Sequence, residues 1–154
     1  MNHTFFNPNR LSAVLMIGVL LLPQLSFSQN ASGPDTAAVP EAYRDRKMPE
    51  GWWTDPSVIS EGKRIYEGKF KPKVLCAPCH GKFGKPKLRG ARDFSDGSVI
   101  SRFTDDYWFW RVSEGVPDTP MKGWTGALSE EEIWKVIAYS HTFSHGGKPA
   151  PHDH

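Results

Sequence analysis

Apolar side chains recur at helical spacing in the stretch that follows Asp55 and Pro56. Asp is a favoured N-cap and Pro is well tolerated at the first helical position, so the two residues together mark a helix start. One face then carries Val58, Ile59, Gly62, Ile65 and Tyr66. A glycine inside a helix costs about 1 kcal/mol relative to alanine, and on a buried face its usual benefit is the close approach of another helix. The pattern predicts a helix that starts at residue 56 and packs tightly on a partner helix.

A second helical pattern, near the C-terminus, has the clearest start signal in the chain. Ser129 and Glu132 form an S-x-x-E capping box, and Leu128 and Ile133 are placed to make a hydrophobic staple across it. The apolar face continues through Val136, Ile137 and Ser140, with Trp134, Tyr139 and Phe143 nearby. Two glycines at residues 146–147 end the predicted helix.

A third helix is predicted between these two. Thr104 is its expected N-cap, the helix runs to Val112, and it stops near Gly115, with Pro117 just beyond. Residues 71–92 show neither helical nor strand periodicity, because glycines and prolines interrupt them. Since the chain has no internal repeat and no convincing strand, the expected fold class is all-α, with three to four helices joined by long loops.

The N-terminal part has the pattern of an export signal. Residues 11–22 are an almost unbroken apolar run, well short of the ~20 residues that span a bilayer. Small residues at Ser26 and Ser28 suit a signal-peptidase site, so we expect residues 1–28 to be a signal peptide cleaved before Gln29. The alternative is an uncleaved membrane anchor. Either way, the functional part is expected outside the cytoplasm, in the periplasm.

The remaining chain has room for one domain and two flanking segments. Residues 29–54 have no apolar periodicity and are expected to be a linker or a draped extension, anchored on the domain by Trp52 and Trp53. The domain itself is expected over residues 55–145 and a flexible tail over residues 146–154. The histidines at this end form either a weak metal site or part of a frayed polar terminus: His141, His145, His152 and His154.

Both cysteines of the chain lie in one motif, Cys76-Ala77-Pro78-Cys79-His80. Two cysteines in an exported protein normally suggest a disulfide, but Cys-x-x-Cys-His is the attachment signature of heme c. Two thiols three residues apart on one turn can each add to a vinyl group of the porphyrin. His80 is then held beneath the iron as the proximal ligand.

Three other uses of this motif are less favoured by its surroundings. A thioredoxin-like redox pair needs a strand before the motif and a helix opening at it, but the residues after His80 are interrupted by Gly81, Gly84 and Pro86. A structural zinc site needs about four ligands, and no second cysteine pair exists. A plain disulfide between Cys76 and Cys79 would close a very short loop, which is unfavourable, and it would leave His80 without a role.

A pure electron carrier needs a sixth ligand on the iron, and Met121 is the only methionine after the motif. It follows Pro117 and Pro120, and two prolines make this segment stiff. A stiff segment suits a thioether that must be held at a fixed distance from the iron. Methionine ligation also raises the reduction potential. The alternatives are that Met121 is ordinary core packing, or that Met48, in the expected linker, is the ligand.

Taken in order, these features resemble the class I monoheme cytochromes c over about residues 56–144. The matching parts are the first helix, the motif with Gly81 after it, residues 115–121 and the closing helix. The resemblance implies a small all-α cytochrome c fold wrapped around one heme c, covalently attached through two thioethers. It also implies that the first and last helices cross at Gly62, Tyr66, Val136 and Tyr139.

The same resemblance implies the surroundings of the iron ligands. The carbonyl of Pro86 is expected to accept a hydrogen bond from Nδ1–H of His80, which would orient the imidazole. Either Trp124 or Arg92 is expected to reach a heme propionate. Lys122 departs from the family pattern, in which many members have Pro after the Met, but this puts no ligand in doubt.

Charge is distributed unevenly along the domain. Residues 63–92 contain ten Lys and Arg against one acid, and residues 93–132 contain nine acids against three bases. The basic half includes the motif, so we expect a basic surround at the heme edge and redox partners with an acidic docking surface. The alternative is a solvated face without a steering role. A formal net charge of +2 gives no indication of a nucleic acid partner.

The sequence therefore predicts a periplasmic one-electron carrier, not an enzyme, with iron held by His80 and Met121. It would act as a mobile shuttle or as the cytochrome subunit of a membrane respiratory complex. A second hypothesis is a heme enzyme or small-ligand sensor with an open iron site. A third is thiol–disulfide exchange through Cys76 and Cys79.

Overall fold

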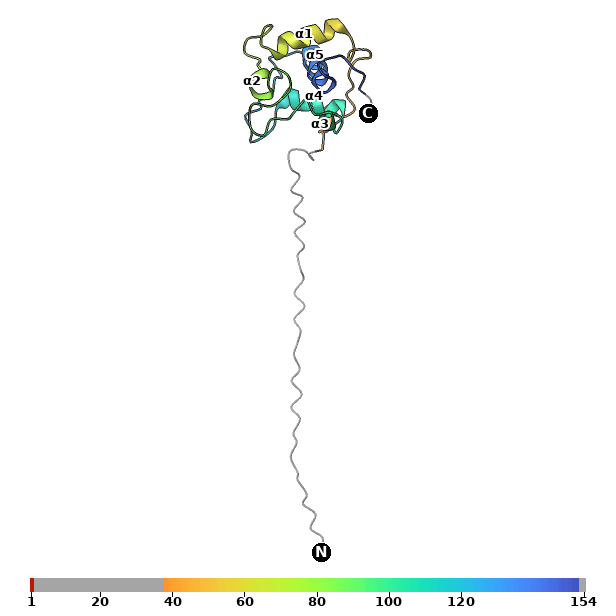
Figure 1. Cartoon of the computed structure of the whole chain (residues 1–154), viewed down its shortest axis with the longest axis vertical. Helices are drawn as coiled ribbons and strands as arrows, with labels where there is room; N and C mark the ends of the chain where they lie inside the picture. The colour runs from red at the N-terminus through yellow and green to blue at the C-terminus, as the bar shows by residue number, and fades with distance from the viewer. Residues whose placement is uncertain (2–37, 153–154) are drawn as a thin grey trace. The chain divides into compact units, whose positions relative to one another are not determined.

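A computed structural model describes Met1 and residues 38–152 of the chain. Within these residues three longer helices form the frame: α1 (Pro56–Tyr66), α4 (Asp105–Glu114) and α5 (Glu130–His141). Helix α5 lies between the other two and packs on both, with the more extensive contact to α1 (Figure 1). The predicted signal peptide, residues 1–28, lies outside the described residues apart from Met1.

Shorter elements complete the fold. Two single-turn helices are α2 (Ala77–His80) and α3 (Gly97–Ile100), and two 3-10 turns are η1 (Glu41–Tyr43) and η2 (Thr142–His145). The described residues contain no strand, only isolated bridges from Gly115 to Lys122 and from Thr125 to Leu128. The all-α class predicted from the sequence is confirmed. Across the described range, no helix is both long and apolar enough to cross a membrane.

The two strongest helix-start signals work as the sequence predicts. The Asp55 carboxylate accepts hydrogen bonds from the amides of Ser57 and Val58 at the start of α1. At α5 the capping box is complete, since the Glu132 amide donates to Ser129 Oγ and the Ser129 amide donates to the Glu132 carboxylate. Each cap satisfies backbone donors that the helix itself leaves without partners, which stabilises the protein by about 1 kcal/mol.

Gly62 lies where α1 and α5 approach each other closely. A Cβ atom at this position would lie 2.0 Å from the carbonyl oxygen of Lys135 and 3.0 Å from Cβ of Tyr139. Next to it, the rings of Tyr66 and Tyr139 meet edge to face with their centroids 5.4 Å apart. The predicted helix crossing is confirmed, and the crossing explains the interior glycine.

The described part of the N-terminal extension, residues 38–54, is draped over α4. The Met48 amide donates to the buried Asp105 carboxylate at 2.9 Å, and the Tyr43 hydroxyl donates to Glu114 at 2.8 Å. Arg46 forms an ion pair with Glu130 at the start of α5. The extension also covers part of the core, against which Val39, Tyr43, Trp52 and Trp53 pack. The predicted anchoring by the two tryptophans is confirmed.

The C-terminal tail also packs on the domain. The rings of Trp53, His141 and His152 contact one another: the Trp53 centroid lies 4.8 Å from that of His141 and 4.6 Å from that of His152, and the two histidine centroids are 4.4 Å apart. His141 is itself buried at the end of α5 and contacts His145 as well. The flexible tail over residues 146–154 stays a prediction: in its described part residues 146–149 are exposed, and the His152 ring packs on the domain. Among the described residues no group of three or more potential ligands could hold a metal ion.

Candidate heme-binding site

The Cys-x-x-Cys-His motif forms one helical turn. Cys76 occupies the N-cap position of α2, and its carbonyl accepts hydrogen bonds from the amides of Cys79 and His80 at 3.2 and 3.0 Å. Both thiols are free, so the cysteines are not joined to each other. This turn is the local geometry that two thioether bonds to one porphyrin require.

The end of α1 holds the motif in place. The buried Tyr66 hydroxyl donates to the Gly81 carbonyl at 2.7 Å, and the Tyr66 carbonyl accepts from the Cys76 amide at 3.2 Å. Gly81 ends α2 with a φ of 77°, and a Cβ atom there would lie 1.9 Å from the Lys85 carbonyl oxygen. The crossing of α1 with α5 is thereby connected directly to the position of the cysteines.

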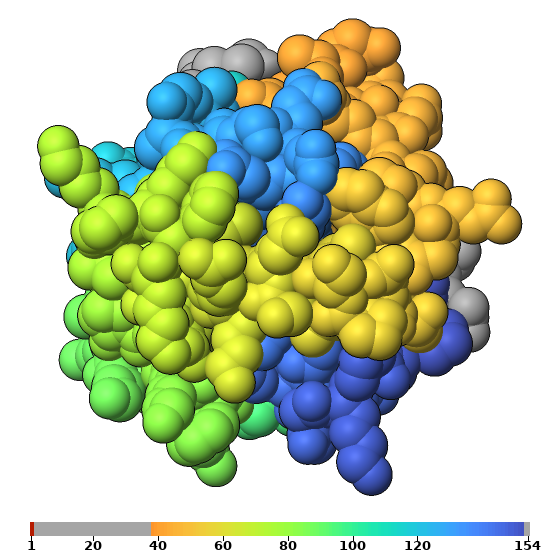
Figure 2. All heavy atoms as spheres, turned by 90° about the horizontal axis from the view of Figure 1, so that it is seen from above, coloured from red at the N-terminus to blue at the C-terminus, as the bar shows by residue number. Residues whose placement is uncertain are grey.

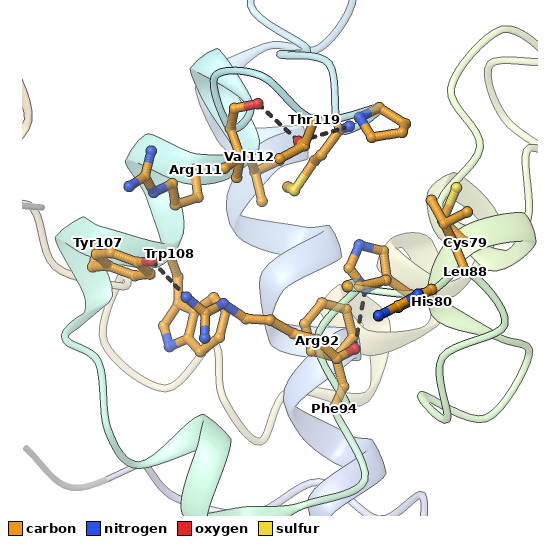
Figure 3. A pocket seen from close by; sticks show the side chains of 16 residues that line it. Cys79, His80, Leu88, Arg92, Phe94, Tyr107, Trp108, Arg111, Val112 and Thr119 are labelled. Atoms are coloured by element: carbon orange, nitrogen blue, oxygen red, sulfur yellow. Dashed lines mark hydrogen bonds between the residues drawn. The ribbon is translucent and has the colours of Figure 1, made fainter. Parts of the chain in front are cut away.

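A hollow of about 180 Å³, partly open to solvent, lies beside the motif (Figure 3). The lining comes from the motif itself, from the loop at residues 88–94, from α4 and from the loop at residues 116–121. Most of the lining is apolar, so the site would exclude water from a bound ring.

A second hollow, of about 60 Å³, shares part of its lining with the first. Four residues line both of them: His80, Phe94, Val112 and Met121. Cys79 lines only the larger hollow and Cys76 only the smaller one. Both cysteines and both candidate iron ligands therefore line two neighbouring hollows that share wall residues.

His80 is oriented by two contacts. Its ring stacks on Phe94, with centroids 4.4 Å apart and an angle of 9° between the planes. Its Nδ1 lies 3.3 Å from the carbonyl oxygen of Arg92. Burial lowers the pKa of His80 below its usual value, although the Arg92 carbonyl opposes this change. A neutral ring with Nδ1 directed at a carbonyl leaves Nε2 as the nitrogen that a metal can bind.

The predicted hydrogen bond from His80 to Pro86 is wrong for this structure, because the acceptor is Arg92. The amides of Lys87 and Leu88 both donate to the Cys79 carbonyl, at 2.9 and 3.1 Å. These bonds fold the chain after Pro86 back onto the motif, and the carbonyl that reaches Nδ1 comes from the following turn of the loop. A backbone acceptor does not depend on side-chain type, so no residue pattern in the sequence could have indicated Arg92.

Met121 sits in a loop that is fixed by its own hydrogen bonds as well as by its prolines. The Met121 carbonyl accepts from the Val116 amide at 3.0 Å, and the Met121 amide donates to Thr119 Oγ1 at 3.2 Å. Asp118 adopts a left-handed φ of 58° that tightens the turn. Met48, the alternative ligand, belongs to the extension, where its side chain is buried, and it lines neither hollow.

Three arginines line the larger hollow: Arg89, Arg92 and Arg111. The Arg92 guanidinium donates to the Tyr107 hydroxyl at 2.8 Å, whereas Arg111 is buried, with its guanidinium 3.7 Å from the centroid of the Trp110 ring. Trp124 lines the smaller hollow. The sequence reasoning named Arg92 and Trp124 but missed Arg89 and Arg111. The signal for Arg111 was its place within an otherwise aromatic, buried helix.

The environment of the thiols argues against thiol–disulfide exchange. Burial, and secondarily the neighbouring Cys79, raises the pKa of the Cys76 thiol to about 12. Cysteines that exchange disulfides have a thiol pKa lowered by nearby positive charge or a helix N-terminus. A half-buried Cys76 thiol that stays protonated at neutral pH is therefore a poor nucleophile for that reaction.

The residues present fit a heme c. Two thiols on one turn match its two vinyl groups, an imidazole and a thioether border the same region, and the walls are apolar with arginines for its carboxylates. No second cysteine pair is left in the sequence for another heme.

Two solved structures are similar to parts of this chain. KustC0563, a c-type cytochrome, matches with a TM-score of 0.46 and 26% identity, over 53% of this chain and 95% of that chain. Cytochrome CL from the marine methylotrophic bacterium Methylophaga aminisulfidivorans MPT matches with a TM-score of 0.47 and 20% identity. That match covers 60% of this chain and 57% of the cytochrome CL chain.

A family model gives the assignment. The model for cytochrome c oxidase, cbb3-type, subunit III matches residues 57–139, more than half of the chain. The match includes α1, the motif and most of α5, in the order that the sequence patterns indicate. The chain therefore belongs to the family of cbb3-type cytochrome c oxidase subunit III, and is a monoheme c-type cytochrome that carries electrons on a covalently bound heme c.

Proposed function

We propose that this protein is a periplasmic one-electron carrier whose heme is attached through Cys76 and Cys79 and whose iron is held by His80 and Met121. The observation that carries this proposal is that His80 and Met121 line both adjoining hollows beside the motif. The family description favours a role as the cytochrome subunit of a respiratory complex, with a mobile shuttle as the other form of the same function.

The role of the protein is to bind, orient and shield the cofactor. When bound, heme c supplies an iron that changes its oxidation state by one electron. His80 presents Nε2 because Nδ1 faces the Arg92 carbonyl. Phe94 and Val112 form apolar walls that would keep water from the porphyrin ring of a bound heme. The internally bonded loop around Met121 holds its thioether with little freedom to move, so little reorganisation accompanies electron transfer.

Replacing Met121 by Leu tests the ligation. Leu keeps most of the volume but lacks sulfur, so we expect loss of the near-infrared sulfur–iron band, a lower reduction potential and rapid binding of carbon monoxide. Met48→Leu is the matched control, since Met48 is buried away from the hollows. It should leave the spectrum and the potential unchanged.

The same spectra decide between the carrier and the open-site hypothesis. A wild-type protein with low-spin heme that resists carbon monoxide supports the carrier. A wild-type protein with high-spin heme that binds carbon monoxide readily would show that the iron has an open position, and the electron-carrier proposal would give way to the enzyme or sensor.

We also propose a docking surface beside the motif. Exposed basic side chains gather here, namely Lys73, Lys82, Lys85, Lys87 and Arg89. Exposed apolar side chains lie among them at Leu75, Phe83 and Leu88, and Phe83 is 71% exposed. Figure 2 shows this part of the chain, in yellow-green, as a continuous surface beside α1. A basic ring around apolar residues fits a redox partner with an acidic docking surface.

Charge reversal at Lys85 and Lys87 tests the docking surface. At low ionic strength, the double Glu variant should associate with an acidic redox partner at least about tenfold more slowly, because long-range attraction is lost. Salt should remove most of the difference. The control is the double variant Lys47→Glu and Lys148→Glu, which makes the same charge change at exposed positions outside this surface. If both double variants slow association equally, net charge is responsible rather than this surface.

A further inference from the structure

We propose that Arg92 is the positioning residue of His80: its carbonyl orients the imidazole, and an aromatic cage of Phe103, Tyr107 and Trp108 holds Arg92 in place. This inference rests on the proposed ligation of iron by His80 and deepens it. The two ends of one residue would then connect α4 to the iron ligand. The cage would thereby contribute to setting the reduction potential.

The backbone end of Arg92 makes the contact with the ring. The distance of 3.3 Å from Nδ1 of His80 to the Arg92 carbonyl oxygen is slightly longer than the usual range for an N–H···O hydrogen bond. It is the one hydrogen bond that the His80 ring makes to any described residue. A bond at this limit weakens with a small displacement of the loop, so its strength depends on what fixes Arg92.

The side-chain end of Arg92 is fixed by aromatic rings. Its guanidinium carbon lies 4.3 Å from the centroid of Phe103, 5.7 Å from that of Tyr107 and 5.9 Å from that of Trp108. It also donates a hydrogen bond to the Tyr107 hydroxyl at 2.8 Å, and Figure 3 shows the side chain extending from the loop toward Tyr107 and Trp108. Arginine suits this place because its planar group stacks on rings and keeps its charge.

The cage is itself rigid. Phe103 and Tyr107 stack with centroids 4.2 Å apart, and Trp108 meets both rings edge-on at 5.5 and 5.8 Å. Tyr107 and Trp108 belong to α4 and Phe103 comes just before its N-cap, so the cage is tied to that helix. Arg92, in contrast, belongs to a loop that carries no regular structure. The aromatic contacts therefore tie the loop to α4 at the residue whose carbonyl faces His80.

The hydrogen bond has a defined effect on iron. Donation from Nδ1–H makes the imidazole a stronger electron donor through Nε2, which stabilises oxidised iron and lowers the potential. Removing the positive charge of Arg92 would also lower the potential, because it would stabilise the more positive iron. A charge-neutral Arg92 variant would thus mix opposing effects. Variants that keep the charge separate them.

The experiment uses the purified holoprotein with Tyr107→Phe and, separately, Arg92→Lys. Both keep the charge, but the first removes the acceptor of the guanidinium and the second removes its planar group. We expect a higher reduction potential and faster solvent exchange of the His80 Nδ1–H proton in the reduced protein, measured by NMR. Exchange should rise by a factor of about 2 to 10, as for loss of one hydrogen bond.

Tyr43→Phe is the matched control, because this hydroxyl also bonds to a side chain of α4, at Glu114, but lies outside the hollows. It should change neither readout. Wild-type exchange and potential in both Tyr107→Phe and Arg92→Lys would overturn the proposal, as would equal changes in Tyr43→Phe. The sulfur–iron band keeps the two proposals apart. If the band persists in all variants, the ligation by Met121 holds even when the Arg92 proposal is overturned. If the proposed ligation itself is wrong, the band is already missing from the wild-type spectrum.

Discussion

A variant in which both Cys76 and Cys79 are replaced by Ala is expected to retain no heme after denaturation. These are the only thiols in the chain, so no other residue can form a thioether. Both lie on one turn beside the hollows, and each borders a different one. Either single variant should keep one thioether bond and a weakened site.

The double variant should also lose most of its stability. Without the cofactor, the apolar side chains around the two hollows have no ring to pack against, and a small domain depends on such a cofactor for its core. We expect loss of a cooperative thermal transition. The measurements are heme staining on a denaturing gel and thermal unfolding followed by circular dichroism.

Pro78→Ala is the control for this prediction. It changes the interior of the motif but keeps both thiols and His80, and Pro78 is exposed. This variant should stain for heme as strongly as wild type. A double cysteine variant that still carries heme through denaturation would contradict the proposed attachment.

The longer helices could be predicted because their signals are local. Asp55 and Pro56 start α1, and Ser129 with Glu132 start α5, through bonds that span only a few residues. Gly62 also predicted a tertiary contact. Because glycine is unfavourable inside a helix, its presence on a buried face indicated that another helix packs there. At α4 the predicted N-cap residue, Thr104, is confirmed, although its hydroxyl bonds to Asp106 instead of a backbone amide.

Other parts of the fold depend on contacts between residues far apart in the sequence. The single turns α2 and α3 are too short to show a period, and the extension is held by bonds such as that from Met48 to Asp105. Nothing near residue 48 indicates that partner. The packing of His152 on Trp53 is likewise invisible in sequence, because a polar tail next to two glycines has the pattern of a free end.

The candidate site divides in the same way. The motif is a local signature, so Cys76, Cys79 and His80 could be found from spacing alone. Met121 could be nominated by elimination and by its stiff loop, and the structure adds that it borders the same hollows as His80; its ligation stays a prediction. The Arg92 carbonyl could not be found, because any residue type supplies a carbonyl and only the course of the loop decides which one reaches Nδ1.

Gly62→Ala is expected to destabilise the protein, although alanine is the better helix former. In an exposed helix the change would stabilise by about 1 kcal/mol. Here the added Cβ would lie 2.0 Å from the Lys135 carbonyl oxygen and 2.6 Å from its carbon. Both atoms belong to the backbone in the middle of α5 and cannot turn aside, so the two helices must separate.

Separation of α1 from α5 would reach the heme site through Tyr66. The Tyr66 ring packs against Tyr139 at the crossing, and its hydroxyl holds the Gly81 carbonyl at the end of the motif. Overpacking of a core usually costs about 1–3 kcal/mol, and a clash with backbone should put Gly62→Ala at the upper end or beyond. Denaturant unfolding of the holoprotein, followed at the heme absorbance, measures this cost.

Gly97→Ala is the matched control for the crossing. Gly97 also lies in a helix, α3, but nothing lies within 4 Å of a Cβ built there. This substitution should leave the free energy of unfolding unchanged or raise it slightly, since alanine restricts the unfolded chain. If Gly62→Ala proved as stable as Gly97→Ala, the close approach of α1 and α5 could not be what requires glycine at position 62, and the link from that crossing through Tyr66 to the motif would fail with it.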